Sequence, residues 1–493
     1  MVNQLYFKAR TKFSNLGFGK IAAGLVILIL VIFSLYRVVT VTATYLHDDL
    51  QMDFSAFYTA GDALNHGLDP YKNNVGIIPT VWDGFDRYTF SRFLYPPLAA
   101  TLFRPFALLG YPDAKLAWTI ISLAGLAFSM FLFVKTFNKP GDKINWWPVA
   151  LVFVGFFFPL TPFVERGQVD AITLLLVSAA LFVLLKKPQW AIAAGILLAF
   201  ATLLKLNCVY LIPFLLLRKQ LKATLGYLAG GVLIVALTLL FNGVDNTFQY
   251  VFTEFPRISA NGENGTPAQQ LPRSDFVKVQ GGTGHYVTKN DTIYAVATIE
   301  FQDNASLSKA VNQVFTNLGL NLNMSLVSAG VLVVFFLVVL AWEFWHKAGP
   351  WFGTRSMLPP RPEFLFWQMV LVIILMASPL TWMMNTIWVI PLFFLPVYYF
   401  THPGQLNSRI SMPLLIFGLL LIALPDLQNG PFTVRRIDQE ALWVKLLTDY
   451  SYCKYFVGEL FIFGGLLFEY LPRTVVRSQK AEARGQELEV GGS

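Results

Sequence analysis

Long apolar runs alternate with short polar connections along this chain. Thirteen runs are long enough to form helices in a membrane or a buried core, and they lie at residues 21–45, 95–110, 114–134, 146–163, 171–185, 190–204, 209–217, 221–241, 322–345, 364–377, 386–400, 410–424 and 456–471. A helix needs about 20 mostly apolar residues to cross a bilayer. The pattern therefore predicts an all-α polytopic membrane protein.

Basic residues in the connections predict the topology. Lys and Arg gather at 135–143, 186–187, 218–222 and 346–361, before residue 410, and in the C-terminal tail. Because cytoplasmic loops carry an excess of Lys and Arg, we place these segments and both termini inside, so the number of crossings must be even. We expect about twelve crossings.

Two regions fit a simple crossing poorly. The run 95–110 is short and contains Pro96, Pro97 and Pro105, so we expect a re-entrant or incomplete segment there. The runs 190–204 and 209–217 are short as well, and one long helix across both is the alternative.

Composition supports one integral membrane unit. The 493 residues are 55% hydrophobic and only 13% charged, against about 25% charged in soluble domains. We expect a cytoplasmic N-terminus at 1–20, a single membrane domain at 21–471 with outer loops at 46–94 and 242–321, and a cytoplasmic tail at 472–493. The run 21–45 is too long for a signal peptide, so we expect a retained helix. The net charge of +8 is explained by the basic inner loops rather than by nucleic-acid binding.

The polar connections on the predicted outer side carry the candidate chemistry. They are 53–93, 165–170, 205–207, 242–321 and 378–385. Five such clusters on one face suggest one site, with interfacial helices in the first outer loop.

The first cluster, "DFSAFYTAGDALNHGLDPY", begins with Asp53 beside the membrane. A carboxylate there could take a proton from a hydroxyl as a general base, or it could cap a helix N-terminus. Within "GLDPY", Gly67 and Pro70 predict a turn that ends the helix and directs Tyr71.

The segment "FVERGQVD" places Glu165, Arg166, Gln168 and Asp170 between two apolar runs. Arg166 could pair with Glu165 or Asp170 and hold two helix ends together, or its planar fork could bind a phosphate. Lys205, in "LLKLN", could extend to the lipid interface or supply a positive charge to a lipid phosphate.

Two further segments offer amide, hydroxyl and aromatic groups. They are "DNASLSKA", with Asn304 and Ser306, and "SPLTWMMN", with Trp382 and Asn385. An aromatic ring beside an amide can stack on a sugar, although Trp is also common at membrane interfaces.

Several familiar chemistries have no matching pattern. The five histidines show no metal-ligand spacing, and the chain contains no HExxH, P-loop or nucleotide fingerprint. Cys208 and Cys453 make no CxxC pair. We therefore expect no metal site and no soluble nucleotide donor.

Six blocks, taken in order, resemble a known family. They are "DFSAFYTAGDALNHGLDPY", "FLYPPLAATLFRPFALLGYPDAKLAW", "ERGQVDAITLLLV", "LLKLNCVYLIPFLLLRKQLK", "NASLSKAV" and "SPLTWMMNTIWVIPL". Together they resemble the polyprenyl-phosphate-mannose-dependent mannosyltransferases, C-type (GT-C) integral membrane enzymes of glycosyltransferase family eighty-seven. The resemblance covers residues 53–391.

The resemblance implies a GT-C fold and a polyprenyl-phosphate-sugar-dependent hexosyltransferase of EC 2.4.1 type. Such an enzyme would transfer mannose or another hexose, with inversion, from the lipid carrier to a hydroxyl of a glycolipid or glycan at the outer face. The location would be a bacterial plasma membrane. The partners would be this donor, this acceptor and membrane lipids, with no nucleic acid, and the scheme requires no cofactor or divalent metal.

The resemblance also implies roles for individual residues. Asp53 falls on the general base, and Arg166 and Lys205 would meet the donor phosphate. Around the sugar and the acceptor we place Tyr58, Glu165, Gln168, Asp170, Asn304, Ser306, Trp382 and Asn385.

Two alternatives remain. Charges and broken helices within a membrane also mark transporters, so a flippase for lipid-linked glycans is possible in principle, although no internal repeat is evident. A non-catalytic relative is the other, because Met384 and Asn385 stand where the family pattern has histidine.

Overall fold

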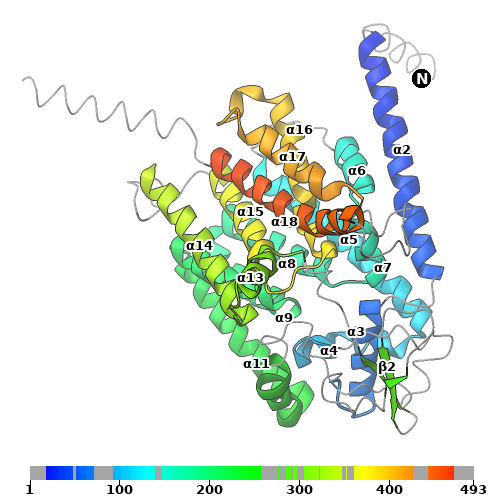
Figure 1. Cartoon of the computed structure of the whole chain (residues 1–493). Coiled ribbons are helices and arrows are strands. Elements are labelled where there is room, and N and C mark those ends of the chain that lie inside the picture. Colours follow the sequence, from blue (N-terminus) through cyan, green and yellow to red (C-terminus); the bar gives the residue numbers. More distant parts are fainter. Residues whose placement is uncertain are drawn as a thin grey trace, which may run out of the picture.

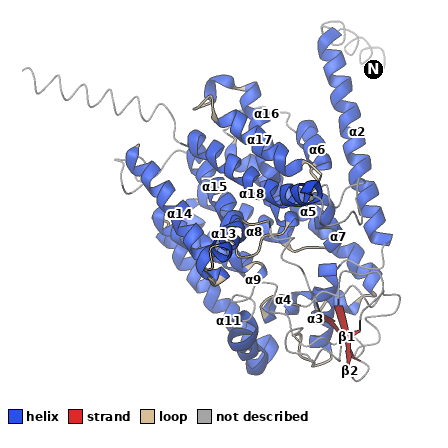
Figure 2. Cartoon of the chain, in the orientation of Figure 1, coloured by secondary structure: helices blue, strands red, loops and turns tan. Residues whose placement is uncertain are grey.

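The structure is a computed structural model of the 493-residue chain, and it is dominated by helices (Figures 1 and 2). It describes residues 18–47, 52–71, 93–138, 147–256, 276–277, 285–289, 292–296, 305–320, 322–346, 351, 360–425 and 442–470.

The first half of the chain contains most of the helices that position the polar clusters. They are α2 (Phe18–His47), α3 (Met52–Asn65), α4 (Pro97–Phe103), η2 (Phe106–Leu108), α5 (Tyr111–Phe137), α6 (Trp147–Phe156), α7 (Leu160–Arg166), α8 (Asp170–Lys186), η3 (Pro188–Trp190), α9 (Ala191–Leu204), η4 (Leu206–Tyr210), α10 (Leu211–Leu217), α11 (Leu221–Gln249) and the π-helical turn η5 (Tyr250–Glu254).

The second half begins with three short strands, β1 (Phe276–Val277), β2 (His285–Lys289) and β3 (Thr292–Val296), which form an antiparallel sheet in that order. The sequence analysis did not predict this sheet. The helices that follow are α13 (Leu307–Asn317), α14 (Met324–Trp345), α15 (Pro360–Ala377), η10 (Met383–Phe393), α16 (Phe394–Thr401), η11 (Pro403–Gln405), α17 (Ser411–Ala423) and α18 (Leu442–Tyr470).

The helices include several of membrane length. Among the described residues, five helices are long and apolar enough to cross a membrane, or up to six if the bent pair α7 and α8 forms one span. This finding confirms a membrane protein with several apolar helices, while the expected twelve crossings stay a prediction. The N-terminal run is confirmed as one long helix, since α2 covers Phe18–His47.

Both regions that fit a crossing poorly are broken. Residues 95–110 form only α4, of 7 residues, and η2, of 3 residues, neither of which can cross a bilayer. Residues 190–217 do not form one long helix, because α9 ends at Leu204, the Lys205 backbone is extended and η4 begins at Leu206.

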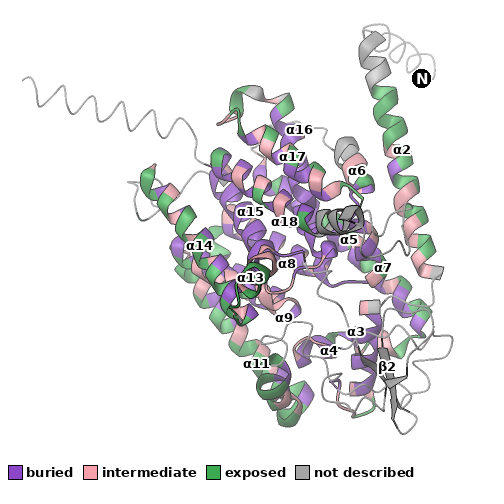
Figure 3. Ribbon diagram, in the orientation of Figure 1, coloured by how far each residue is buried: buried purple, intermediate pink, exposed green. Residues whose placement is uncertain are grey.

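Burial separates the lipid-facing helices from the core. Helices α2, α11 and α14 expose many apolar side chains, whereas α15 is buried over most of its length (Figure 3). The largest buried cluster joins side chains of α5, α8, α9, α15 and η10. A second buried cluster, rich in aromatic rings, packs α3 against α4 and the start of α5.

The short helix α3 is held tightly to α4. A β-carbon at Gly61 would come within 2.7 Å of the Phe103 backbone, so the close contact requires glycine there. After α3, Gly67 adopts a φ of 69°, and the Tyr71 hydroxyl donates a hydrogen bond to the Tyr95 carbonyl at 2.8 Å. The predicted turn that directs Tyr71 is confirmed, and it joins the first polar cluster to "FLYPPL".

Candidate active site

Asp53 lies in the first turn of α3 and faces the segment that follows α7. Its Oδ2 accepts a hydrogen bond from Gln168 Nε2, and its Oδ1 lies 3.8 Å from Arg166 Nη1. A carboxylate is favoured in the first turn of a helix by the helix dipole. Since α3 begins at Met52, Asp53 is inside the helix rather than at its N-cap position, and its carboxylate points to another element.

A sharp bend at Gly167 presents the polar side chains of "ERGQVD". Gly167 has a φ of 66° and a ψ of 42°, the left-handed region that favours glycine, and the axes of α7 and α8 differ by 113°. The Trp118 indole donates a hydrogen bond to the Gly167 carbonyl at 2.7 Å. This fixed turn places Arg166 at the end of α7 and Asp170 in the first turn of α8.

Arg166 lies between an acid and an aromatic ring. Its guanidinium carbon is 5.0 Å from the centre of the Trp382 ring, and its Nη1 forms the ion pair with Asp53. The side chain is 22% exposed, so the guanidinium keeps access to solvent. Cation–π contact orients the fork without using its N–H groups.

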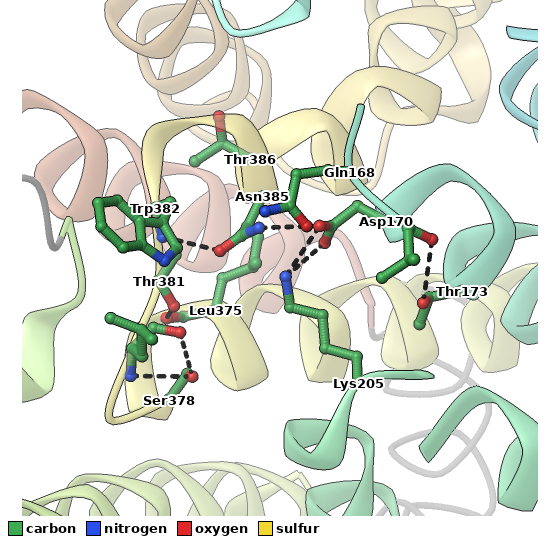
Figure 4. Close-up of polar contacts among 12 residues, drawn as sticks. Gln168, Asp170, Thr173, Lys205, Leu375, Ser378, Thr381, Trp382, Asn385 and Thr386 are labelled. Atoms are coloured by element: carbon green, nitrogen blue, oxygen red, sulfur yellow. Dashed lines mark hydrogen bonds and ion pairs between the residues drawn. The ribbon is translucent and has the colours of Figure 1, made fainter. Parts of the chain in front are cut away.

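Lys205 and Asp170 form a second, tighter ion pair (Figure 4). Lys205 Nζ is 2.7 Å from Asp170 Oδ1 and 2.9 Å from Oδ2, and Asn385 Nδ2 donates to the same Oδ2 at 2.9 Å. The Asp170 side chain is fully buried, whereas the Lys205 side chain is 13% exposed. Three charge-assisted hydrogen bonds satisfy a carboxylate that would otherwise be costly to bury.

Asn385 connects this pair to the Trp382 backbone. Its Oδ1 accepts a hydrogen bond from the Trp382 backbone nitrogen at 2.7 Å, which stabilises the first turn of η10 (Figure 4). Lys205, Asp170, Asn385 and Trp382 therefore form one continuous chain of polar contacts.

Tyr95 is a member of the site that the sequence analysis missed. Its hydroxyl donates to Gln168 Oε1 at 3.4 Å. Burial raises the pKa of Tyr95 well above its ordinary value, and the carboxylates of Asp53 and Asp170 raise it further. The hydroxyl therefore stays protonated beside both acids, and the only sequence signal was its place in "FLYPPL".

Two acids and two cations thus gather where α3, α7, α8 and α9 meet. The sequence model of glycosyltransferase family 87 matches residues 93–379, more than half of the chain. The chain belongs to glycosyltransferase family 87. No curated protein matches it.

The family 87 match contains Arg166, Gln168, Asp170 and Lys205. It begins after Asp53 and ends before Trp382 and Asn385. The fold brings these outer residues to the matched ones, because Asp53 contacts Gln168 and Asn385 contacts Asp170.

The observed ion pairs differ from the expected pairs in this family 87 protein. Arg166 pairs with Asp53 rather than with Glu165 or Asp170, and Lys205 pairs with Asp170 rather than extending to the lipid interface. The segments are 35 or more residues apart, so local spacing could not indicate which acid meets which cation.

Other predicted residues lie around or outside this cluster. The Tyr58 hydroxyl donates to the Leu109 carbonyl at 2.8 Å, and burial, with a contribution from Asp62, raises the pKa of Tyr58 to about 12. Tyr58 therefore supports the aromatic cluster under α3. Glu165 is exposed next to Arg166 on α7.

The segment before α13 lies beside the start of η10. Ser306 is buried and caps α13 by accepting a hydrogen bond from the Lys309 backbone nitrogen at 3.2 Å. The Ala305 nitrogen donates to the Thr381 carbonyl at 2.6 Å, which places Ser306 near Trp382. Asn304 lies outside the described residues.

Metal ligands were searched for in the same part of the chain. Among the described residues, no group of three or more His, Cys, Asp or Glu side chains could hold a metal ion. The cations of the cluster are instead the side chains of Arg166 and Lys205.

Proposed function

We propose that this family 87 glycosyltransferase transfers a hexose from a polyprenyl monophosphate carrier to a hydroxyl of a glycolipid or glycan. The observation that carries the proposal is the ion pair between Asp53 and Arg166, at 3.8 Å, with both side chains partly exposed. It sets a candidate base next to a candidate phosphate ligand, so an acceptor hydroxyl and a donor phosphate bound to them would be neighbours.

The chemistry needs little more than these groups. Asp53 takes the proton of the acceptor hydroxyl while the acceptor oxygen forms a bond to the anomeric carbon of the sugar. The bond from that carbon to the phosphate oxygen breaks, and the phosphate leaves with the electron pair. A single displacement of this kind inverts the anomeric centre.

Arg166 and Lys205 stabilise the charge on the departing phosphate. The Arg166 fork suits two phosphate oxygens. Two N–H groups of Lys205 Nζ bond Asp170, and within the described part of the chain the third remains for a ligand. Positive groups already fixed in a water-poor site stabilise developing negative charge strongly. No step of this scheme requires a divalent metal.

The buried groups hold the exposed groups in place. Asp170 and Asn385 are fully or almost fully buried and bond to protein partners, so we assign them to positioning Lys205 and Trp382. Trp382 offers its ring to the sugar beside Arg166. We place the site at the extracytoplasmic face, with both termini in the cytoplasm, because of the distribution of basic residues between the apolar runs.

The test is sugar transfer by the purified protein from polyprenyl phosphate hexoses to extracted membrane lipids. We expect activity in the wild type and a loss of about 10² to 10⁴ in kcat for Asp53→Asn, because general bases contribute about that much. Asp113→Asn removes the same charge from an exposed position on α5 and should retain activity.

Full activity of a folded Asp53→Asn variant would exclude Asp53 as the base. Movement of the lipid across a vesicle bilayer without sugar transfer would instead identify a transporter.

A further inference from the structure

The two acid–cation pairs of the site are held very differently. Asp170 is fully buried, contacts Lys205 Nζ with both carboxylate oxygens at 2.7 and 2.9 Å, and also accepts from Asn385. Removing one partner from such a pair would leave a buried charge without compensation, which is costly. The Lys205–Asp170 pair is therefore a fixed part of the site.

The Arg166–Asp53 pair is loose. Its closest atoms are 3.8 Å apart, and the side chains are 22% and 13% exposed. Within the described ranges, the Arg166 guanidinium donates no hydrogen bond. Asp53 therefore does not bind it through two parallel N–H groups. A longer contact between two partly solvated groups makes this the weaker of the two ion pairs.

A phosphate is a stronger partner for Arg166 than this carboxylate. The planar guanidinium binds two phosphate oxygens at once, which adds both energy and geometry. The cation–π contact with the Trp382 ring does not use the guanidinium N–H groups, which can therefore bind such a ligand.

We propose, building on the proposed function, that the donor phosphate and the Asp53 carboxylate compete for Arg166. Donor binding then turns Arg166 from Asp53 to the phosphate. The carboxylate, no longer stabilised by that cation, becomes a stronger base for the acceptor hydroxyl. Asp53 is thus a stronger base for the acceptor hydroxyl only while the sugar donor is bound.

Other polar groups of the described residues lie close to this ion pair. The uncharged Gln168 side chain donates a hydrogen bond to Asp53, and the Tyr95 hydroxyl, from the segment before α4, donates to Gln168. Asp170 is negative and already neutralised by Lys205, and Glu165 is exposed on α7 beside Arg166.

Binding of the carrier alone tests the competition. The probe is a short polyprenyl monophosphate without sugar, titrated into purified protein in detergent. We expect Asp53→Asn to bind the probe about fivefold tighter than wild type, because the competing anion is gone. Arg166→Gln should bind about tenfold weaker or worse, and Asp113→Asn should bind like wild type.

The double variant separates competition from simple repulsion. If Asp53 competes for Arg166, then Asp53→Asn should give little gain in the Arg166→Gln background, whereas repulsion alone would give the same gain in both backgrounds. Circular dichroism and gel filtration check that each variant is folded. Unchanged or weaker binding by folded Asp53→Asn, or an equal gain in both backgrounds, would overturn the proposal.

The same experiment distinguishes the two levels of inference. A wild-type protein that binds no polyprenyl monophosphate refutes the proposed function and the competition together. A wild type that binds and transfers, with no gain in Asp53→Asn, refutes the competition alone.

The pH profile of transfer gives an independent reading. The pH dependence of kcat reports the pKa of the base in the donor-bound site, and that of kcat/KM for the donor reports its pKa in the free enzyme. For wild type, we therefore expect the acid limb of kcat at higher pH than the acid limb of kcat/KM. Acid limbs at the same pH would contradict a change in the basicity of Asp53 on donor binding.

Discussion

At the scale of single residues, Asn385 shows how one amide can organise a site that it does not face. It is 1% exposed, and it uses its oxygen for the Trp382 backbone and its nitrogen for Asp170. Since it accepts one hydrogen bond and donates another, its side chain connects the fixed ion pair to the ring beside Arg166.

Changing Asn385 tests this role. Asn385→Ala should lower the free energy of unfolding by about 2 kcal/mol, because the buried Asp170 oxygen loses a hydrogen bond. Asn385→Asp should cost more, since it removes the donor and sets a second carboxylate against Asp170. Thermal unfolding in detergent measures both, with Gln313→Ala on the exposed face of α13 as the control. Equal stability of the Asn385→Ala and Asn385→Asp proteins would contradict the assigned contacts.

At the scale of elements, the site depends on helices that are too short to cross a membrane. Helix α3 has 14 residues, α7 has 7 and α4 has 7; Asp53 lies in the first turn of α3, and Arg166 is the last residue of α7. The proline-rich run and the turn at Gly67 could be predicted from local sequence, because proline and glycine act locally. The break at Lys205 was indicated by the polar residues Lys205 and Asn207 between two short apolar runs. The partner of each charge could not be predicted, since it lies in a distant segment.

Helix α3 carries a second acid whose environment gives a pH dependence. Asp62 is buried, and burial raises the pKa of its carboxyl while His66 lowers it by a smaller amount. Among the described residues its Oδ2 has no hydrogen-bond partner. Because the folded protein favours the protonated form, the stability contributed by Asp62 is present below its unfolded pKa and is lost as the pH rises through the folded pKa.

We therefore expect Asp62→Asn to stabilise the protein at neutral pH. The gain over wild type should shrink as the pH falls through the folded pKa of Asp62 and should be smallest below the unfolded pKa of about 3.9, where the carboxyl is protonated in both states. Unfolding midpoints at several pH values measure the difference, and Asp113→Asn serves as the exposed control. A constant difference between Asp62→Asn and wild type across this range would refute the explanation.

At the scale of the whole molecule, two ionic clusters lie at the two ends of one helical run. Lys205 directly precedes η4, and Arg218 directly follows α10, so about 20 Å of helix separates the active-site cluster from a second cluster. In the second cluster Arg218 bonds Glu343 of α14 at 2.8 Å, Glu363 of α15 at 3.0 Å and the Tyr470 hydroxyl of α18 at 3.1 Å. Contacts that join residues 125 to 252 positions apart leave no trace in local sequence.

This second cluster should be a main source of stability against unfolding. Arg218→Gln leaves two buried carboxylates without their cation, so we expect a loss of about 3–5 kcal/mol. Lys222→Gln, an exposed position at the same end, removes the same charge and should change stability by less than about 0.5 kcal/mol. Chemical or thermal unfolding in detergent compares the two variants. Similar stabilities would show that the cluster contributes little.

The length of the exposed helix α2 couples its tilt to the thickness of the bilayer. Its span Gly24–Leu46 has 23 residues, only 6% of its apolar window is buried by protein, and α3 with Asp53 follows shortly after it. At about 1.5 Å per residue the span is about 35 Å long, somewhat more than the roughly 30 Å hydrocarbon layer of a typical membrane. Hydrophobic mismatch of this size is relieved by tilting. The thickness of the membrane thus acts on the tilt of α2 together with its packing against α6.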